Sequence, residues 1–227
     1  MPLILNIDTA IDTASVCLAK DEEVLSIVKN DKQKDHAGWL HVAIKEMFEK
    51  ASISLKDLDA VAVTIGPGSY TGLRVGLAAA KGICFALEKP LITVNTLLVM
   101  ANAAKHVHED NFGEPADLLC PMIDARRMEV FAAIYTNDLE VIKEPVALVI
   151  NENSFAEELS SKIICFSGNG SAKLKPIIKN EHAKFSAVVF DASHMAALTE
   201  SFYKKKQFAD LAYTEPLYLK EFYTPAR

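Results

Sequence analysis

Apolar residues in the first half of the chain fall into short continuous runs and helically spaced sets. AVAVTIG at 60–66 is a continuous apolar run, which is typical of a central strand covered on both faces. Leu40, Ile44 and Met47 share one face of a helical pattern. The pattern predicts three strands, a helix, a strand, a helix, a strand and a helix, over residues 3–9, 15–20, 24–29, 36–51, 60–66, 71–88, 91–95 and 96–109. The short connections between the first three strands predict an antiparallel meander.

The same order of elements returns in the second half, after the segment EDNFGEPADLL at 109–119, which we interpret as a linker. The expected strands are 118–125, 129–137, 140–150, 163–168 and 185–190, and the expected helices follow Asn153 or Ser154, GNGSAKL at 168–174, and Asp191 or Ser193.

Two halves with one order of elements predict an α/β protein with mixed sheets flanked by helices. Facing each other, they have the two-lobed architecture of the actin, Hsp70 and sugar kinase (ASKHA) superfamily. We therefore expect a first lobe at 1–109 and a second lobe at 110–227. The tail at 208–227 is left free to pack back on the first lobe.

Composition excludes several classes of protein. Half of the 227 residues are hydrophobic and 24% are charged, which argues against global disorder. The net charge of -6 argues against a stand-alone nucleic-acid binder, which is expected to be basic. The four cysteines are widely spaced in apolar sequence, as expected of reduced thiols in the cytoplasm. We recognise no signal peptide and no membrane span, so we expect a cytoplasmic protein with no membrane partner.

The segment GPGSYTGLRVG at 66–76 holds four of the nine glycines and lies between a strand and a helix. Free N–H groups and the helix dipole can hold an anion at such a place. The Walker A pattern fails because Leu73 and Arg74 follow Gly72, and the Rossmann spacing is missed by one residue. An anion would therefore bind around Ser69–Gly72, with Ser69 or Thr71 as the N-cap.

The helix that follows suggests another use for these glycines. Gly72, Gly76, Ala80 and Cys84 form one ridge of small side chains at i+4 spacing. Glycine in an exposed helix interior costs about 1 kcal/mol relative to alanine, so two on one ridge need a reason. Close approach of another helix is one reason and phosphate binding is the other. Local chemistry leaves both open.

The first strand of each half ends in an aspartate. In an actin-like fold Asp8 and Asp124 would face a cleft where carboxylates hold a metal-bound nucleotide; alternatively, each simply begins a turn. The turns after them contain no glycine, which weakens an ATPase interpretation. His36 and His41 lie about 140° apart on a helix with ~100° per residue, so they cannot chelate one ion. We expect no metal site and no catalytic residue.

Several motifs in order resemble the bacterial TsaB (YeaZ) family. They are IDTA at the start, HAGWLH, GPGSYTGLRVG, PLITVNTL, MIDARRMEVFAAIY and PLYLK near the end. The resemblance covers essentially the whole chain. It implies a non-catalytic scaffold subunit for tRNA threonylcarbamoyladenosine synthesis, which binds the transferase TsaD through helices of the first lobe. It also implies that the ATPase TsaE joins the complex, that the isolated chain forms a homodimer, and that tRNA is reached only through the complex.

The resemblance also implies where the transferase would hold its metal. The two histidines of TsaD fall on Thr96 and Met100 here, and neither suits such a site. We therefore expect no cofactor, with weak nucleotide or phosphate binding left open. The alternatives are an active nucleotide-binding ATPase of the same fold and a glycoprotease-type metallopeptidase.

Two sets of site residues follow from this reasoning. The expected partner interface is Leu40, Ile44, Met47, Gly72, Gly76, Ala80 and Cys84. The candidate anion or nucleotide site is Asp8, Gly66, Gly68, Ser69, Thr71, Gly72 and Asp124. A large residue at Gly76 is expected to abolish TsaD binding and leave the monomer folded.

Overall fold

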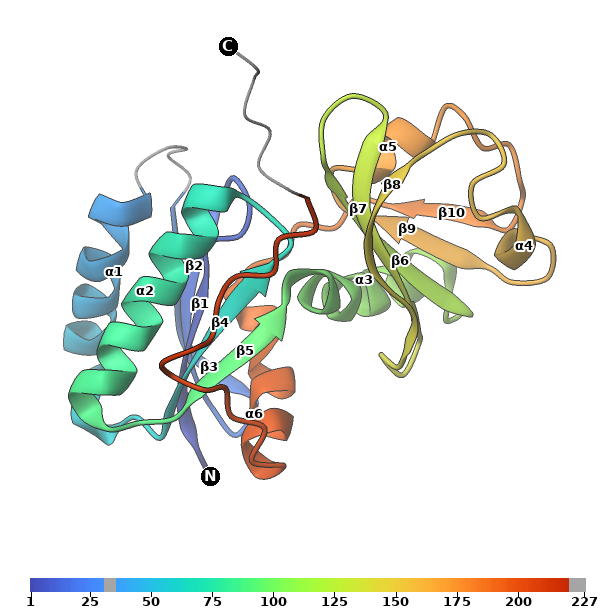
Figure 1. Cartoon of the computed structure of the whole chain (residues 1–227). Helices are drawn as coiled ribbons and strands as arrows, with labels where there is room; N and C mark the ends of the chain where they lie inside the picture. The colour runs from blue at the N-terminus through green and yellow to red at the C-terminus, as the bar shows by residue number, and fades with distance from the viewer. Residues whose placement is uncertain (31–35, 221–227) are drawn as a thin grey trace, which may run out of the picture. The chain divides into compact units, whose positions relative to one another are not determined.

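The computed structural model describes residues 1–30 and 36–220, which form two compact units (Figure 1). The first unit comprises Met1–Val99 and Phe190–Pro216. The second comprises Met100–Val189, joined by the described residues after Pro216. Each unit is an α/β layer structure built on one mixed five-stranded sheet, as the sequence predicts.

The sheet of the first unit has the strand order β3-β2-β1-β4-β5. Its strands are β1 (Leu3–Asp8), β2 (Ala14–Lys20), β3 (Glu23–Asn30), β4 (Ala60–Gly66) and β5 (Leu91–Asn95). The first three are antiparallel, which confirms the predicted meander, and β4 and β5 run parallel to β1. The carboxyl ends of β1, β4 and β5 therefore meet at one edge of the sheet.

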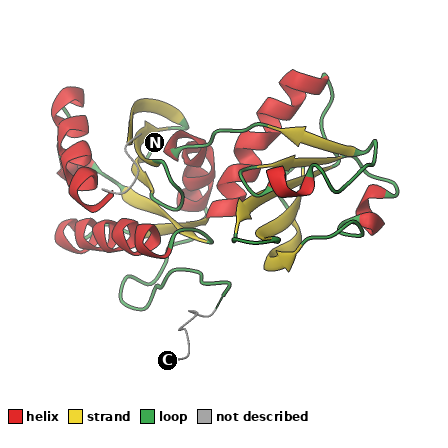
Figure 2. Ribbon diagram, turned by 90° about the horizontal axis from the view of Figure 1, so that it is seen from above, coloured by secondary structure: helices red, strands yellow, loops and turns green. Residues whose placement is uncertain are grey.

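Helices cover both faces of this sheet. They are α1 (His36–Ala51), α2 (Tyr70–Leu87) and α6 (Ala196–Lys204), with short 3-10 turns at Leu55–Asp57 and Ala192–Met195. Leu5 and Ile7 of β1 pack in one apolar core with α1 and α2. Asn6 points to the other face, where its side-chain oxygen accepts a hydrogen bond from Thr199 of α6 at 2.9 Å. Figures 1 and 2 show α1 and α2 side by side.

The second unit repeats the plan with the strand order β10-β9-β6-β7-β8. Its strands are β6 (Leu118–Asp124), β7 (Glu129–Thr136), β8 (Val141–Val149), β9 (Ile164–Ser167) and β10 (Ala183–Ser186), and its short helices are α4 (Ala156–Leu159) and α5 (Ser171–Leu174). Cys120 and Met122 of β6 pack with Leu159 and Leu174 in the core of this unit. The helix α3 (Thr96–Phe112) runs from the first unit into the second.

The division of the chain differs from the one expected at residue 109. The units change after Val99, inside α3. The helix α3 continues to Phe112, past the start of the expected linker. Residues 190–216 belong to the first unit instead of the second. The amide of Ala192 donates to the Ser15 hydroxyl at 2.8 Å, and α6 packs on β1. Contacts between segments far apart in sequence leave no signal in local periodicity.

Two expected helices of the second half are present but short. The helix α4 has four residues and follows Phe155, which is left-handed and gives no side-chain cap. The helix α5 also has four residues, and Pro176, which lacks an N–H donor, follows soon after it. Asp191 is a cap, since its side chain accepts from the amide of Ser193, but it caps the 3-10 turn Ala192–Met195 instead of the expected long helix. The helix α6 begins after Met195, which gives no side-chain cap.

Candidate functional site

The glycine segment packs directly on the turn that follows β1. The amide of Ser69 donates to the carbonyl oxygen of Ala10 at 2.7 Å, and a Cβ on Gly68 would collide with the same oxygen. Ser69 is the N-cap of α2, as predicted, and its hydroxyl accepts from the amide of Gly72 at 3.3 Å. The N–H groups of Ser69 and Gly72 are therefore already bonded. Anion binding around Ser69–Gly72 stays a prediction.

The ridge of small residues on α2 lies against the protein's own sheet. A Cβ on Gly72 would collide with the carbonyl oxygen of Thr9, and one on Gly76 would collide with the Thr9 hydroxyl. That hydroxyl donates to the carbonyl oxygen of Gly72 at 2.7 Å. Ala80 and Cys84, further along the ridge, are fully buried. These glycines let α2 approach β1, so the expectation that the ridge faces a second helix has to be corrected.

The expected partner face of α1 needs the same correction. Leu40 and Met47 are 0% exposed and Ile44 is 4% exposed in the single chain. They form the core with β1 and β2, so they offer almost no surface to another protein. A large residue at Gly76 should disturb the monomer for the same reason, contrary to the expectation from the sequence.

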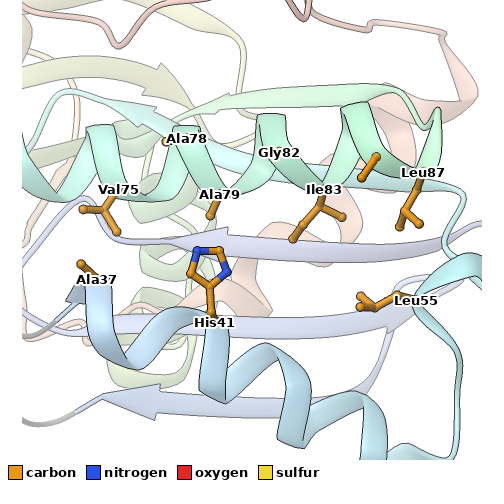
Figure 3. Close-up of a pocket in the computed structure, with 10 residues that line it drawn as sticks. Ala37, His41, Leu55, Val75, Ala78, Ala79, Gly82, Ile83 and Leu87 are labelled. Carbon is orange, nitrogen blue, oxygen red and sulfur yellow. The ribbon is translucent and has the colours of Figure 1, made fainter.

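A different, exposed surface lies between α1 and α2 (Figure 3). It is a groove of about 500 Å³. Among the described residues that line it, His41 carries the one polar side chain; the lining is Ala37, His41, Leu55, Val75, Ala78, Ala79, Gly82, Ile83, Ala86 and Leu87. A Cβ on Gly82 would meet nothing within 4 Å. We call this surface the α1–α2 groove.

Sequence reasoning missed this groove because α2 carries two ridges of small residues. The ridge Ala78, Gly82 and Ala86 has the same i+4 spacing as the first and is exposed. A signal was present: Val75, Ile83 and Leu87 flank the second ridge at helical spacing. Periodicity alone does not say which ridge faces the sheet.

Asp8 lies at the end of β1 and is fully buried. One carboxylate oxygen accepts from the Thr64 hydroxyl at 2.7 Å and from the amide of Ala10 at 3.1 Å. The other oxygen has no hydrogen-bond partner among the described residues. Burial raises the pKa of Asp8 to about 6, against the opposing effect of these two hydrogen bonds. The ionised Asp8 carboxylate therefore lowers the stability of the first unit.

Asp191, whose charge also raises the pKa of Asp8, has partners on both of its carboxylate oxygens. It forms an ion pair with Lys29 at 2.5 Å and accepts from the amide and hydroxyl of Ser193. Burial opposes its ionisation, but hydrogen bonds from His194, Lys29 and Ser193 outweigh it and hold its pKa well below the ordinary range.

Asp124, at the end of β6 in the second unit, is exposed, whereas Asp8 is buried. Its carboxylate accepts from Lys173 at 2.7 Å and from the amide of Arg126 at 2.6 Å. The bond from Lys173 lowers its pKa. The use of Asp8 or Asp124 by a nucleotide stays a prediction.

The two positions where the resemblance places the metal ligands of TsaD are both buried. Thr96 has a hydroxyl with no partner in the described part of the chain, and the Met100 methyl group lies against Gly168. Across residues 1–30 and 36–220 there is no cluster of three or more His, Cys, Asp or Glu side chains suited to a metal ion. None of the described helices is long and apolar enough to span a bilayer.

A family model supports the assignment. The model described as tRNA N6-adenosine threonylcarbamoyltransferase, TsaD, matches residues 23–222. Because that match covers most of the chain, the protein belongs to the TsaD family.

Within this family the chain is similar to TsaB, also called YeaZ. The tRNA threonylcarbamoyladenosine biosynthesis protein TsaB of Haemophilus influenzae is 27% identical over 96% of this chain and 93% of its own length. The Bacillus subtilis protein of the same name is 26% identical over 96% and 93%. The structure of YeaZ from Pseudomonas aeruginosa superimposes with a TM-score of 0.84 at 22% identity, over 96% of this chain and 100% of that one. The predicted resemblance to the TsaB (YeaZ) family is confirmed, and so is the predicted α/β class with mixed sheets flanked by helices.

Proposed function

We propose that this chain is a non-catalytic subunit in the biosynthesis of tRNA threonylcarbamoyladenosine, and that it binds the transferase TsaD through the α1–α2 groove. The family and the TsaB relatives support the pathway. The groove is the observation that carries the binding mode. In this proposal TsaE joins the complex in the cytoplasm, tRNA is reached through the complex, and the isolated chain forms a homodimer.

The lining of the groove suits a helix of another protein. Small side chains at Ala78, Gly82 and Ala86 let a second backbone come close, and Val75 and Ile83 supply apolar walls. Burial of these side chains by a partner would favour binding by about 25 cal/mol per Å² of apolar area removed from water.

Next to the groove, the exposed surface of α1 is charged. Lys45 lies one helical turn beyond His41 and pairs with Glu49 in an exposed i,i+4 ion pair. An apolar centre with a charged rim is the usual anatomy of a protein interface. Surface ion pairs contribute little to stability, so Lys45 and Glu49 can exchange this pair for one with another protein at little cost.

The chemistry of Thr96 and Met100 supports a non-catalytic role. A threonine hydroxyl and a thioether replace the two imidazoles that the TsaD resemblance expects there, and the Met100 methyl group contacts Gly168. Neither group is a strong ligand for a hard cation. The transfer would then depend on the partner.

A bulky residue in the groove tests the proposal. Gly82→Trp should fill space that is open in the monomer, and therefore leave the fold intact while excluding a partner helix. We expect the affinity for TsaD to fall at least about tenfold, or ~1.4 kcal/mol, in calorimetry. Reconstituted tRNA modification should fall with it.

Ala197→Trp is the matched control, because Ala197 is an exposed small residue on α6, outside the groove. It should bind TsaD as the unmodified chain does. If Gly82→Trp bound TsaD with unchanged affinity, the groove would not be the interface. If the unmodified chain failed to bind TsaD at all, the proposed function itself would fall.

A further inference from the structure

The loop between β6 and β7 presents two arginines to solvent. Arg126 and Arg127 are both exposed, and both adopt left-handed backbone conformations with φ of 70° and 48°. Residues other than glycine rarely adopt this region, and a pair in succession is uncommon. Surrounding structure must therefore hold the loop in place.

Three hydrogen bonds of the backbone hold this loop in place. The amide of Arg126 donates to the Asp124 carboxylate at 2.6 Å, and the amide of Ala125 donates to the carbonyl oxygen of Glu129 at 3.0 Å. The carbonyl oxygen of Met128 accepts from the amide of Ile150, which follows β8, at 2.9 Å. The two guanidinium groups therefore extend from a fixed base.

The acidic side chains beside the arginines are already paired with lysines from elsewhere in the same unit. Lys173 of α5 bonds Asp124 at 2.7 Å, and Lys220 forms an ion pair with Glu129. Lys220 also donates to the carbonyl oxygen of Ala125 at 3.3 Å. In the described part of the chain, neither arginine forms an ion pair. The loop is thus a cationic tip on a chain whose net charge is -6.

We propose that the Arg126–Arg127 loop contacts the phosphodiester backbone of RNA when this chain is part of its complex. The inference rests on the proposed function, which brings a tRNA to that complex. A guanidinium presents a planar fork of donors that matches phosphate oxygens, and it stays charged at any physiological pH. Two phosphate contacts are too few to bind RNA alone, which agrees with the acidic net charge. They add affinity to a surface completed by the partner.

RNA suits this tip better than an acidic protein does. Lys173 and Lys220 neutralise the two nearby carboxylates, which would otherwise repel a polyanion. Binding to a single protein carboxylate would not require this neutralisation. The exposed side chains of the tip are the two arginines and Met128, whereas protein interfaces bury an apolar centre of several residues. An acidic protein surface remains an outcome of the test.

The double variant Arg126→Gly/Arg127→Gly tests the inference in the assembled complex with TsaD. Glycine accepts both left-handed conformations, so thermal unfolding and size-exclusion elution with TsaD should be unchanged. We expect tRNA affinity of the complex to fall at least about threefold at 0.15 M salt. The slope of log K against log salt should decrease by roughly 0.7–0.9 for each lost phosphate contact.

Two controls separate the outcomes. Lys162→Ala/Lys179→Ala removes two charges from exposed positions elsewhere in the same unit, and should leave the salt slope unchanged. Arg126→Lys/Arg127→Lys should keep most of the slope. If the glycine variant forms the complex and binds tRNA with the unmodified slope, the inference is wrong and the proposed function stands. If that variant loses TsaD itself, the loop is a protein contact, which also overturns the inference.

Discussion

At the scale of single residues, Asp8 shows how a polar side chain can be placed at an energetic cost. It is fully buried, with one oxygen bonded twice and the other without a partner among the described residues. A carboxylate removed from water is costly unless hydrogen bonds compensate it. The cost appears as the pKa near 6.

The Asp8 carboxyl should therefore make stability depend on pH. The unfolded chain loses this proton near pH 3.8, and the folded protein keeps it until about pH 6. Between these values the folded state binds more protons, so the contribution of Asp8 to stability falls as pH rises, and it stays low above pH 6. The total change is roughly 3 kcal/mol, for a shift of about two pKa units.

Replacing the acid isolates this effect. Asp8→Asn cannot ionise, so its stability relative to the unmodified protein should improve as pH rises from 4 to 7, by up to about 3 kcal/mol in urea denaturation. If the difference between Asp8→Asn and the unmodified protein stayed constant with pH, the Asp8 carboxyl would not be desolvated.

The position of Asp8 could be read from the sequence, but its environment could not. The polar pair Asp8 and Thr9 after an apolar run marks the end of a strand. The environment of Asp8 depends on Thr64, which comes from β4 and is far away in the sequence. Asp124 ends the corresponding strand of the second half and is exposed, so similar local patterns lead to opposite environments.

At the scale of elements, α2 shows what periodicity fixes and what it leaves undecided. The helix, its Ser69 cap and its end after Leu87 follow from the sequence. Which of its two small ridges faces the sheet does not, because both contain glycine and alanine at i+4 spacing. Thr9 decides the matter, since its carbonyl and hydroxyl occupy the space that side chains at Gly72 and Gly76 would need.

The two ridges of α2 should respond oppositely to one substitution. Gly72→Ala brings a methyl group against the Thr9 carbonyl, so we expect a loss of about 2 kcal/mol or more. Gly82→Ala meets open space in a helix interior and should gain about 0.5–1 kcal/mol. Urea denaturation of the two variants against the unmodified chain measures both. A similar loss in both would mean that Gly82 also contacts the core.

At the scale of the whole molecule, the first unit is closed by residues that come late in the chain. Residues 190–216 return to it, and Ala209 forms a bridge with Leu91 on the edge strand β5. Lys81 of α2 holds the same segment through the carbonyl oxygens of Ala212 at 3.2 Å and Thr214 at 2.8 Å. Covering an edge strand in this way removes a template for aggregation.

This closure predicts a local rather than a global effect for Lys81. In Lys81→Met, the apolar stem of the side chain remains but the donors that hold the two carbonyl oxygens are lost. The amide of Ala209, which donates to the Leu91 carbonyl oxygen at 2.8 Å, should then open more often. We expect its hydrogen exchange to accelerate at least about tenfold, or ~1.4 kcal/mol of local stability, while amides of β1 keep their protection. Lys45→Met, at an exposed site on α1, should change neither. Equal acceleration throughout the sheet would instead show that Lys81 supports the unit as a whole, and unchanged exchange at Ala209 would show that the bridge to β5 holds the tail without it.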